Sequence, residues 1–186
     1  NWVLLPPVPF NAFENHAPGG IFRPMPPSAA ERHFLGTDTT SRDILARLFY
    51  GTRIALIFAL AFTACVYVIG ITIGCAMGYF GGVFDLVFQR IIEIWSNVPF
   101  LYMVIIIFSV IPSTVAVATQ IGILLLVMVL FSWTGMTYYM RTETYKEKSR
   151  DYIASARVIG ASNTRIIFRH VMPNVLSTLV TFMPFT

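Results

Sequence analysis

Charged residues are absent from two long stretches of this chain and gather between them. Residues Ile54–Phe80 form a run of 27 without a charge, and Ile94–Met140 form a run of 47. Because about 20 helical residues cross the hydrocarbon core of a bilayer, the first run predicts one span and the second predicts two, divided near Pro112. Val171–Thr186 is again apolar and predicts the first part of a fourth span. The pattern predicts an all-α fold, a polytopic transmembrane helical bundle, of which this chain is a fragment with about four spans.

Glycine and proline positions add detail to the predicted spans. Gly70, Gly74 and Gly78 stand four apart and share one helix face, where small residues let another helix approach closely. This spacing predicts a helix-packing face. Pro99 lies inside the second predicted span, where it is expected to kink or break the helix. Between the first two spans, residues 81–93 predict a short loop.

A mixed polar and apolar stretch, Asp151–Asn174, separates the last two hydrophobic blocks. Gly160 is expected to end a first helix, because glycine adopts a positive φ without steric strain. Ser162 can cap a second helix, which runs into Pro173. The stretch therefore predicts a helix, a glycine corner and a second helix at the membrane surface. The first helix has an apolar stripe at three-residue spacing, made by Ile153, Ala156 and Ile159.

The N-terminal part of the chain is rich in proline, which predicts an extended, irregular segment over about the first 40 residues. After it, Thr40 or Ser41 can cap a helix that lies along the outer membrane interface. The chain is then expected to turn into the membrane at Gly51.

Composition and charge favour a membrane protein over a nucleic-acid-binding one. Hydrophobic residues make up 56% of the chain and charged residues 12%, against roughly 25% charged in typical soluble domains. The net charge is +4, but seven of the 13 basic residues lie between Arg141 and Arg169. Positively charged loops stay in the cytoplasm. This region and the 81–90 loop are therefore predicted to be cytoplasmic, and residues 1–53 to be external.

The sequence lacks the motifs of several kinds of catalysis. It has no Gly-x-x-x-x-Gly-Lys-Ser/Thr phosphate loop and no Gly-x-Ser-x-Gly nucleophile elbow. The three histidines have no metal-ligand spacing with a cysteine or with each other. We therefore expect no cofactor or metal on this chain, and any ATP to be bound and hydrolysed on a partner subunit.

The Asp151–Asn174 stretch resembles the cytoplasmic coupling loop of bacterial ABC importer permeases. That pattern is Glu-Ala-Ala, three residues, Gly, nine residues, Ile, one residue, Leu-Pro. Aligned on Gly160 and Pro173, the Glu-Ala-Ala positions fall on Ala154, Ser155 and Ala156, so the glutamate is absent. The family's Ile and Leu positions fall on His170 and Met172. The resemblance implies an ATPase-coupling set of Asp151, Ala154, Ser155, Ala156, Gly160, Ala161, Ser162, Ile166, His170, Pro173 and Asn174.

Two further runs resemble the peptide-and-nickel branch of the same family. Residues 35–53 resemble its LGTD-x-x-GRD-x-x-x-R-x-x-YG-x-R run, with Ser41 in place of the glycine, and residues 78–90 resemble its GYYGG-x-x-D-x-x-x-x-R segment. NWVLLPP, the proline-rich stretch and FLGTD are similar to the Yej-type importers of microcin C and oligopeptides. The resemblance covers essentially the whole chain.

This resemblance implies an ABC type I importer permease in the bacterial inner membrane. Residues 1–53 would be an extracytoplasmic segment with an interfacial helix, and residues 54–186 the transmembrane permease domain, with the cytoplasmic coupling loop at 141–174. The implied partners are a second permease subunit in a heterodimer, ABC ATPase subunits, an extracytoplasmic substrate-binding protein and the lipid bilayer. The implied cargo is an oligopeptide or a peptide-like antibiotic of the microcin C type.

Other functions stay open on the sequence alone. Within transport, the alternative is a dipeptide or nickel permease of the same branch. Outside transport, it is an intramembrane enzyme or a non-transporting scaffold. An enzyme would need a catalytic pair deep in a span, and the predicted spans carry no charge beyond Glu93 at the start of one.

Overall fold

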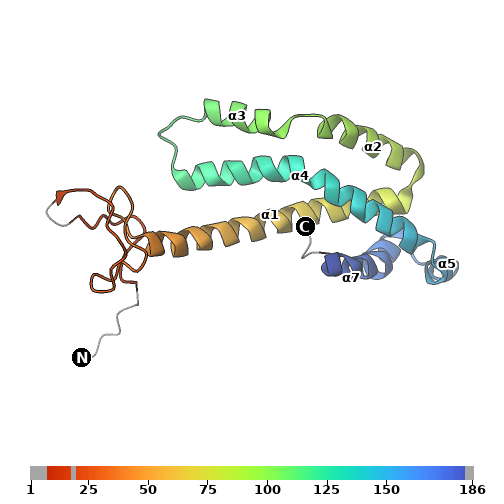
Figure 1. Ribbon diagram of the computed structural model, residues 1–186. Helices are drawn as coiled ribbons and strands as arrows, with labels where there is room; N and C mark the ends of the chain where they lie inside the picture. Colours follow the sequence, from red (N-terminus) through yellow and green to blue (C-terminus); the bar gives the residue numbers. More distant parts are fainter. Residues whose placement is uncertain (1–7, 18–19, 183–186) are drawn as a thin grey trace. The chain divides into compact units, whose positions relative to one another are not determined.

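The computed structural model of the protein describes residues 8–17 and 20–182, and Figure 1 shows it as a ribbon. Within these residues the regular structure is helical, and β-pairing is confined to isolated bridges between Ser28 and His33 and between Thr37 and Asp43. The chain divides into two units, residues 1–60 and 61–186, which are described separately. The NWVLLPP motif lies outside the described residues.

Side chains from distant positions bind the irregular part of the first unit together. His33 Nδ1 and Asp43 Oδ2 lie 2.7 Å apart, both fully buried. The ring of Phe10 stacks on that of His33 at 4.2 Å between centroids. The backbone N–H of Arg23 donates to Ser41 Oγ at 2.9 Å. Since a proline-rich chain offers few backbone donors, side chains make many of its cross-links.

The first helix begins at a cap that differs from the predicted one. Asp43 Oδ1 accepts a hydrogen bond from the backbone N–H of Ala46 at 2.7 Å, so Asp43 caps the helix. The prediction that Thr40 or Ser41 would do so is wrong. Thr40 instead donates its hydroxyl to Asp38, and Ser41 has a positive φ of 57°. The family motif has glycine where Ser41 stands, which fits this left-handed backbone.

Helix α1, Ile44–Phe80, is 37 residues long and runs through Gly51 without a break. The predicted turn at Gly51 is therefore wrong. A single glycine costs a helix only about 1 kcal/mol relative to alanine, which is too little to stop one that is capped at its start and continues into a long apolar run. At 1.5 Å per residue, α1 is about 55 Å long, more than the ~30 Å hydrocarbon core.

Helix α2, Gly82–Ser96, occupies the stretch where a loop was predicted. Gly81 and Gly82 both have positive φ, 64° and 56°, and they reverse the chain within two residues of the end of α1. The loop prediction is wrong because this reversal needs no further residues. Helix α3, Phe100–Val110, follows, and the two helices are bent by 65° at the break before it. Pro99 stands at this break, as predicted.

Helix α4, Val117–Lys148, begins after the Pro112 turn, which divides the long apolar run as predicted. The chain continues as α5, Asp151–Val158, then α6, Asn163–Ile166, then a π-helical turn η2, Ile167–Val171, and finally α7, Met172–Phe182.

The described residues include two helices long and apolar enough to cross a membrane, α1 and α4, and a third span if the bent pair α2–α3 counts as one. The fourth predicted span extends past Phe182 and so lies partly outside the described residues.

A hydrophobic core of the second unit lies where α4, α5, α6, η2 and α7 meet the C-terminal end of α1. Its buried members come from every one of these elements: Cys75, Tyr79, Met140, Ile153, Ile166, Ile167, Val171, Val175 and Leu179. The short helices after α4 are therefore packed on the ends of the long helices.

Candidate functional site

The segment Asp151–Asn174, called here the 151–174 segment, has the helix, glycine corner and second helix that the sequence predicts. Helix α5 ends at Val158, and Gly160 has a φ of 85°, a conformation that favours glycine. The hydroxyl of Ser162 accepts a hydrogen bond from the backbone N–H of Arg165 at 3.4 Å and caps α6.

The apolar stripe predicted for α5 is only partly buried. Ile153 is fully buried and Ala156 packs against the core, but Ile159 is 85% exposed. Because α5 ends at Val158, Ile159 no longer continues the helical stripe. Val158 is 88% exposed as well. The corner at Gly160 thus carries two neighbouring apolar side chains on its surface.

Pro173 does not end the second helix. The chain widens into the π-turn η2, in which the backbone N–H of Met172 donates to the Ile167 carbonyl, and then continues as α7. Proline has no N–H and crowds the preceding turn, so widening that turn lets the helix pass. The His170 carbonyl accepts a hydrogen bond from Asn174 Nδ2 at 2.7 Å.

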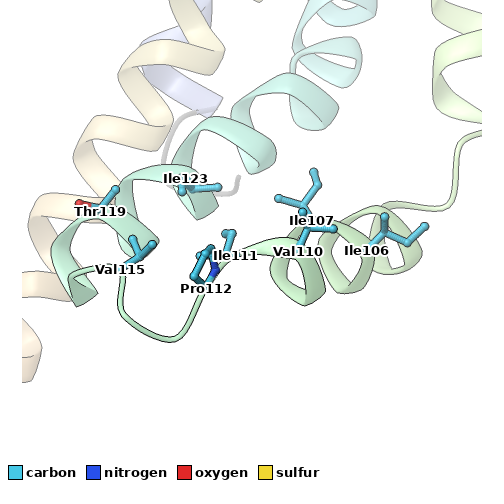
Figure 2. A pocket seen from close by; sticks show the side chains of 8 residues that line it. All are labelled: Ile106, Ile107, Val110, Ile111, Pro112, Val115, Thr119 and Ile123. Atoms are coloured by element: carbon cyan, nitrogen blue, oxygen red, sulfur yellow. The ribbon is translucent and has the colours of Figure 1, made fainter.

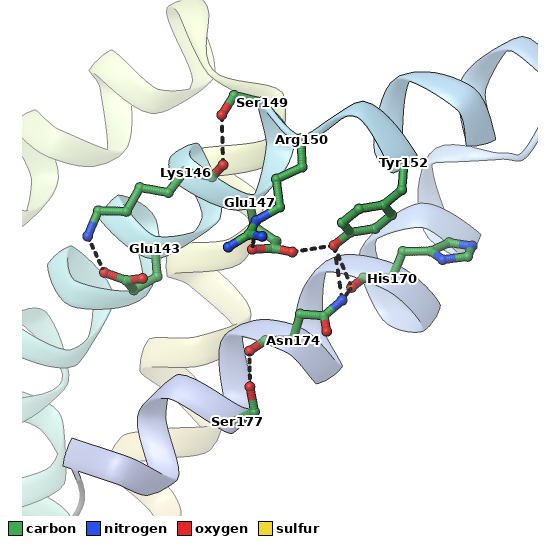
Figure 3. Close-up of polar contacts among 9 residues, drawn as sticks. All are labelled: Glu143, Lys146, Glu147, Ser149, Arg150, Tyr152, His170, Asn174 and Ser177. Carbon is green, nitrogen blue, oxygen red and sulfur yellow. Dashed lines mark hydrogen bonds and ion pairs between the residues drawn. The ribbon is translucent and has the colours of Figure 1, made fainter.

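Tyr152 joins the start of α5 to two other elements, as Figure 3 shows. Its hydroxyl donates to the carboxylate of Glu147 at the end of α4 and accepts from Asn174 Nδ2 of α7 at 3.0 Å. Glu147 also pairs with Arg150 at 2.8 Å. Partial burial, and then the bond to the negative Glu147, raise the pKa of Tyr152.

Tyr79, near the end of α1, makes a separate set of contacts with the segment. Its hydroxyl donates to Asn163 Oδ1 of α6 at 2.8 Å. Its backbone carbonyl accepts from Lys148 Nζ, and the Arg157 guanidinium lies 5.4 Å from the centre of its ring. Tyr79 is 3% exposed. Nothing in the sequence indicated these contacts, since Tyr79 and Asn163 are 84 residues apart.

A second polar contact joins α2 to α4. Arg141 donates to both carboxylate oxygens of Asp85, at 2.5 and 2.6 Å, and the Tyr145 hydroxyl donates to Asp85 at 2.7 Å. The Asp85 side chain is only 6% exposed, which makes this a largely desolvated ion pair.

The three glycines of α1 lie against α4. A Cβ built on Gly74 would lie 2.5 Å from the Thr137 carbonyl oxygen, and one built on Gly78 would lie 2.6 Å from Thr144 Cβ. A Cβ on Gly70 would lie 2.6 Å from side-chain atoms of Met136. No side chain other than hydrogen fits at these positions without movement.

The remaining residues of the predicted coupling set differ in exposure. Asp151, Ala154, Ser155, Pro173 and Asn174 are exposed. Ala161 packs against the core, His170 is half-buried and Ile166 is fully buried. The set therefore contains an outer face that a partner could contact and an inner face that holds the segment on the helices.

An apolar hollow of about 560 Å³ lies between the end of α3 and the start of α4, and Figure 2 shows its lining. Thr119 is the one polar residue among those that line it; the others are Ile106, Ile107, Val110, Ile111, Pro112, Val115 and Ile123. Such a lining favours apolar contacts. In the part of the chain that the structure describes, no group of three or more side chains is arranged to hold a metal ion.

Residues 70–186 match the protein family described as "Binding-protein-dependent transport system inner membrane component". The match covers more than half of the chain and includes α4 and the whole 151–174 segment. The chain belongs to this family, which consists of permease components of the inner membrane.

Individual proteins that resemble this chain are also named as permeases. The chain is 40% identical over 185 residues to the inner membrane ABC transporter permease protein YejE of Escherichia coli (strain K12), covering 99% of this chain and 52% of that protein. It is 42% identical over 153 residues to the peptidoglycan transport system permease protein YejE of Agrobacterium fabrum, covering 82% of this chain and 39% of that protein.

A third relative is the oligopeptide transport system permease protein OppC of Lactococcus lactis subsp. lactis, 38% identical over 148 residues, covering 80% of this chain and 48% of that protein. The chain thus spans about half the length, or less, of these relatives.

Proposed function

We propose that this chain is the transmembrane permease subunit of an ATP-driven ABC importer that moves oligopeptides or peptide-like compounds across the bacterial inner membrane. The observation that carries the proposal is the 151–174 segment, which presents a glycine corner on its surface and buries its other face on α1 and α4. The family match supports the same reading. ATP would be bound and hydrolysed on a separate subunit.

The distribution of charge supports the orientation that this function needs. Basic residues follow one another from Arg141 to Arg169, and positively charged loops are retained in the cytoplasm. The 151–174 segment would then face the cytoplasm, where ATPase subunits are. Residues 1–53 would face outward, toward an extracytoplasmic binding protein.

The mechanism follows from the two faces of the segment. A groove on the ATPase would receive the corner around Gly160, where Val158 and Ile159 are exposed. Ile153 and Ile166 lie in one core with Tyr79 of α1 and Met140 of α4. Closure of the ATPase would therefore move the cytoplasmic ends of these long helices and alternate access to a path shared with a second permease subunit.

The names of the relatives guide the choice of cargo. They mention peptidoglycan and oligopeptides, which have short peptide chains in common. We infer a cargo with a short peptide chain, which includes antibiotics of the microcin C type. A dipeptide or a nickel chelate is the alternative within transport, and a non-transporting scaffold is the alternative outside it.

The direct test is ATP-dependent uptake in proteoliposomes that contain the full-length permease, its partner permease, the ATPase subunits and the binding protein. An oligopeptide, a peptidoglycan-derived peptide and a nickel chelate would be offered together. Accumulation of a peptide supports the proposal. Accumulation of nickel instead would correct the cargo, and no ATP-dependent accumulation by an assembled complex would overturn the transport function.

Gly160 offers the sharpest single change. Proline fixes φ near −65°, which is incompatible with the observed 85°, so Gly160→Pro should distort the corner. We expect the complex to remain in the membrane but to lose substrate-stimulated ATP hydrolysis. Gly160→Asn is the matched control, because asparagine tolerates a left-handed backbone. Unchanged hydrolysis in Gly160→Pro would contradict the coupling role.

A further inference from the structure

The 151–174 segment is joined to the long helices by short connections that could bend. Ser149 and Arg150 separate α4 from α5, and residues 159–162, which include Gly160, separate α5 from α6. If the segment rotated about these connections, a displacement of the glycine corner would not reach the long helices. Transmission therefore requires contacts that fix both α5 and α6 to the long helices.

The buried hydrophobic side chains supply only part of that constraint. Apolar contacts are non-directional, so they resist separation better than sliding or rotation. Hydrogen bonds to fixed partners add direction. Two tyrosine hydroxyls make such bonds: that of Tyr79 to the start of α6, in the middle of the segment, and that of Tyr152 to the end of α4 and the start of α7.

The Tyr79 contact fixes the start of α6 to α1. Its hydroxyl bond to Asn163 Oδ1 is 2.8 Å long. Two cations lie near its ring, Arg157 of α5 at 5.4 Å and Lys148 of α4 at 5.6 Å from the ring centre. One side chain of α1 thus touches the end of α4, α5 and α6.

The Tyr152 contact fixes the start of α5 to the opposite end of the segment. Glu147 accepts from its hydroxyl, and Asn174 Nδ2 donates both to that hydroxyl and to the His170 carbonyl beside the π-turn (Figure 3). The hydroxyl is therefore the point at which α4, α5 and α7 meet.

We propose that Tyr79 and Tyr152 are positioning residues that clamp the 151–174 segment to α1, α4 and α7, so that a displacement of the corner reaches these helices instead of bending the connections. This proposal rests on the proposed coupling function. It assigns the role to the two hydroxyl groups and leaves the burial of the rings as a separate, structural contribution.

The experiment compares Tyr79→Phe, Tyr152→Phe and the double variant in the full importer complex in proteoliposomes. Phenylalanine keeps the ring and removes only the hydroxyl. The measured quantity is the number of cargo molecules taken up per ATP hydrolysed, with a tripeptide as the probe. We expect each single change to lower this ratio about three-fold and the double change about nine-fold, since such bonds are individually modest and the two hydroxyls share no hydrogen-bond partner.

Matched variants separate the hydroxyl bond from general damage. Asn163→Asp keeps an acceptor for Tyr79 and should retain the ratio, whereas Asn163→Leu removes it and should behave like Tyr79→Phe. Combining Tyr79→Phe with Asn163→Leu should add nothing further. Tyr102→Phe changes an exposed tyrosine of α3 and serves as the neutral control.

The outcomes distinguish this inference from the proposed function. If the unmodified complex shows no ATP-dependent uptake of any cargo, the proposed function fails. If it transports a tripeptide and the phenylalanine variants keep the same uptake per ATP, only the clamp fails. A parallel fall of uptake and hydrolysis at a constant ratio, together with less complex in the membrane, would assign the tyrosines a purely structural role and overturn the clamp.

Discussion

Helix α4 packs against its neighbours in the second unit in two different ways. The contact with α1 is close because Gly74 and Gly78 have no side chains to hold the two backbones apart. Toward α2 and α3, the contact is made by side chains that reach across, such as Asp85 to Arg141. Helix α3, over its whole length, buries none of its residues in the structure.

The difference concerns how much each contact tolerates change. A glycine seam depends on the absence of atoms, so any added side chain forces the helices apart. A contact made by individual side chains loses only the bond that is removed. We therefore expect a change at one glycine to disturb the whole contact between α1 and α4, called here the α1–α4 seam. The α2–α3 pair should instead be attached to α4 at separate points, so that a change at one point leaves the others intact.

The largest effect is expected from Gly74→Leu. A Cβ alone would already lie 2.5 Å from the Thr137 carbonyl oxygen and 2.7 Å from Met140 Cβ. Overpacking of this kind costs about 3 kcal/mol or more of stability. The measurement is the thermal unfolding midpoint of the purified complex in detergent, with the amount of assembled complex as a second readout.

Gly122→Leu is the control for this change. Gly122 also lies in a long helix, α4, but a Cβ there would meet none of the described atoms within 4 Å. We expect its midpoint to stay at or slightly above that of the unmodified protein, because leucine has the higher helix propensity. If both changes destabilised the protein equally, close packing of Gly74 against α4 could not be the cause, and the prediction would be contradicted.

The span pattern and the glycine corner were predictable because each depends on local chemistry. Runs without charge mark residues that fit the hydrocarbon core. Pro99 lacks a backbone donor, so a bend at its position follows from the residue itself. Gly160 needs no neighbour to make its positive φ favourable.

The features that the sequence predicted wrongly, or did not predict, are those that depend on tertiary structure. Propensity alone suggested a break at Gly51, but the cap at Asp43 and the apolar run beyond it make α1 continuous. The bond between Tyr79 and Asn163 and that between Asp85 and Arg141 join positions far apart in the chain. One sequence contains no signal that pairs them.

An intermediate effect is expected from Asp85→Asn. The change removes a charge from a bidentate pair with Arg141 and leaves that guanidinium, 21% exposed, without its counter-charge. We expect a loss of about 2 kcal/mol in stability, less than for a fully buried pair. Arg90→Gln on the same helix is the control, since its pair with Glu93 is exposed and should contribute less than about 0.5 kcal/mol. The two midpoints, measured as above, should therefore differ clearly.

The smallest effect is expected from Trp95→Phe, at the far end of α2. Trp95 Nε1 donates to the Leu130 carbonyl of α4 at 2.8 Å, and its ring stacks on Phe131 with centroids 5.4 Å apart. Phenylalanine keeps an aromatic ring for the stack but loses the hydrogen bond and the second ring of the indole, so we expect a loss of about 1 kcal/mol. If the α2–α3 pair is attached at separate points, this loss should add to that of Asp85→Asn in the double variant. A double variant markedly less stable than the sum would mean that α2 and α3 dock on α4 as one cooperative body, as α1 does.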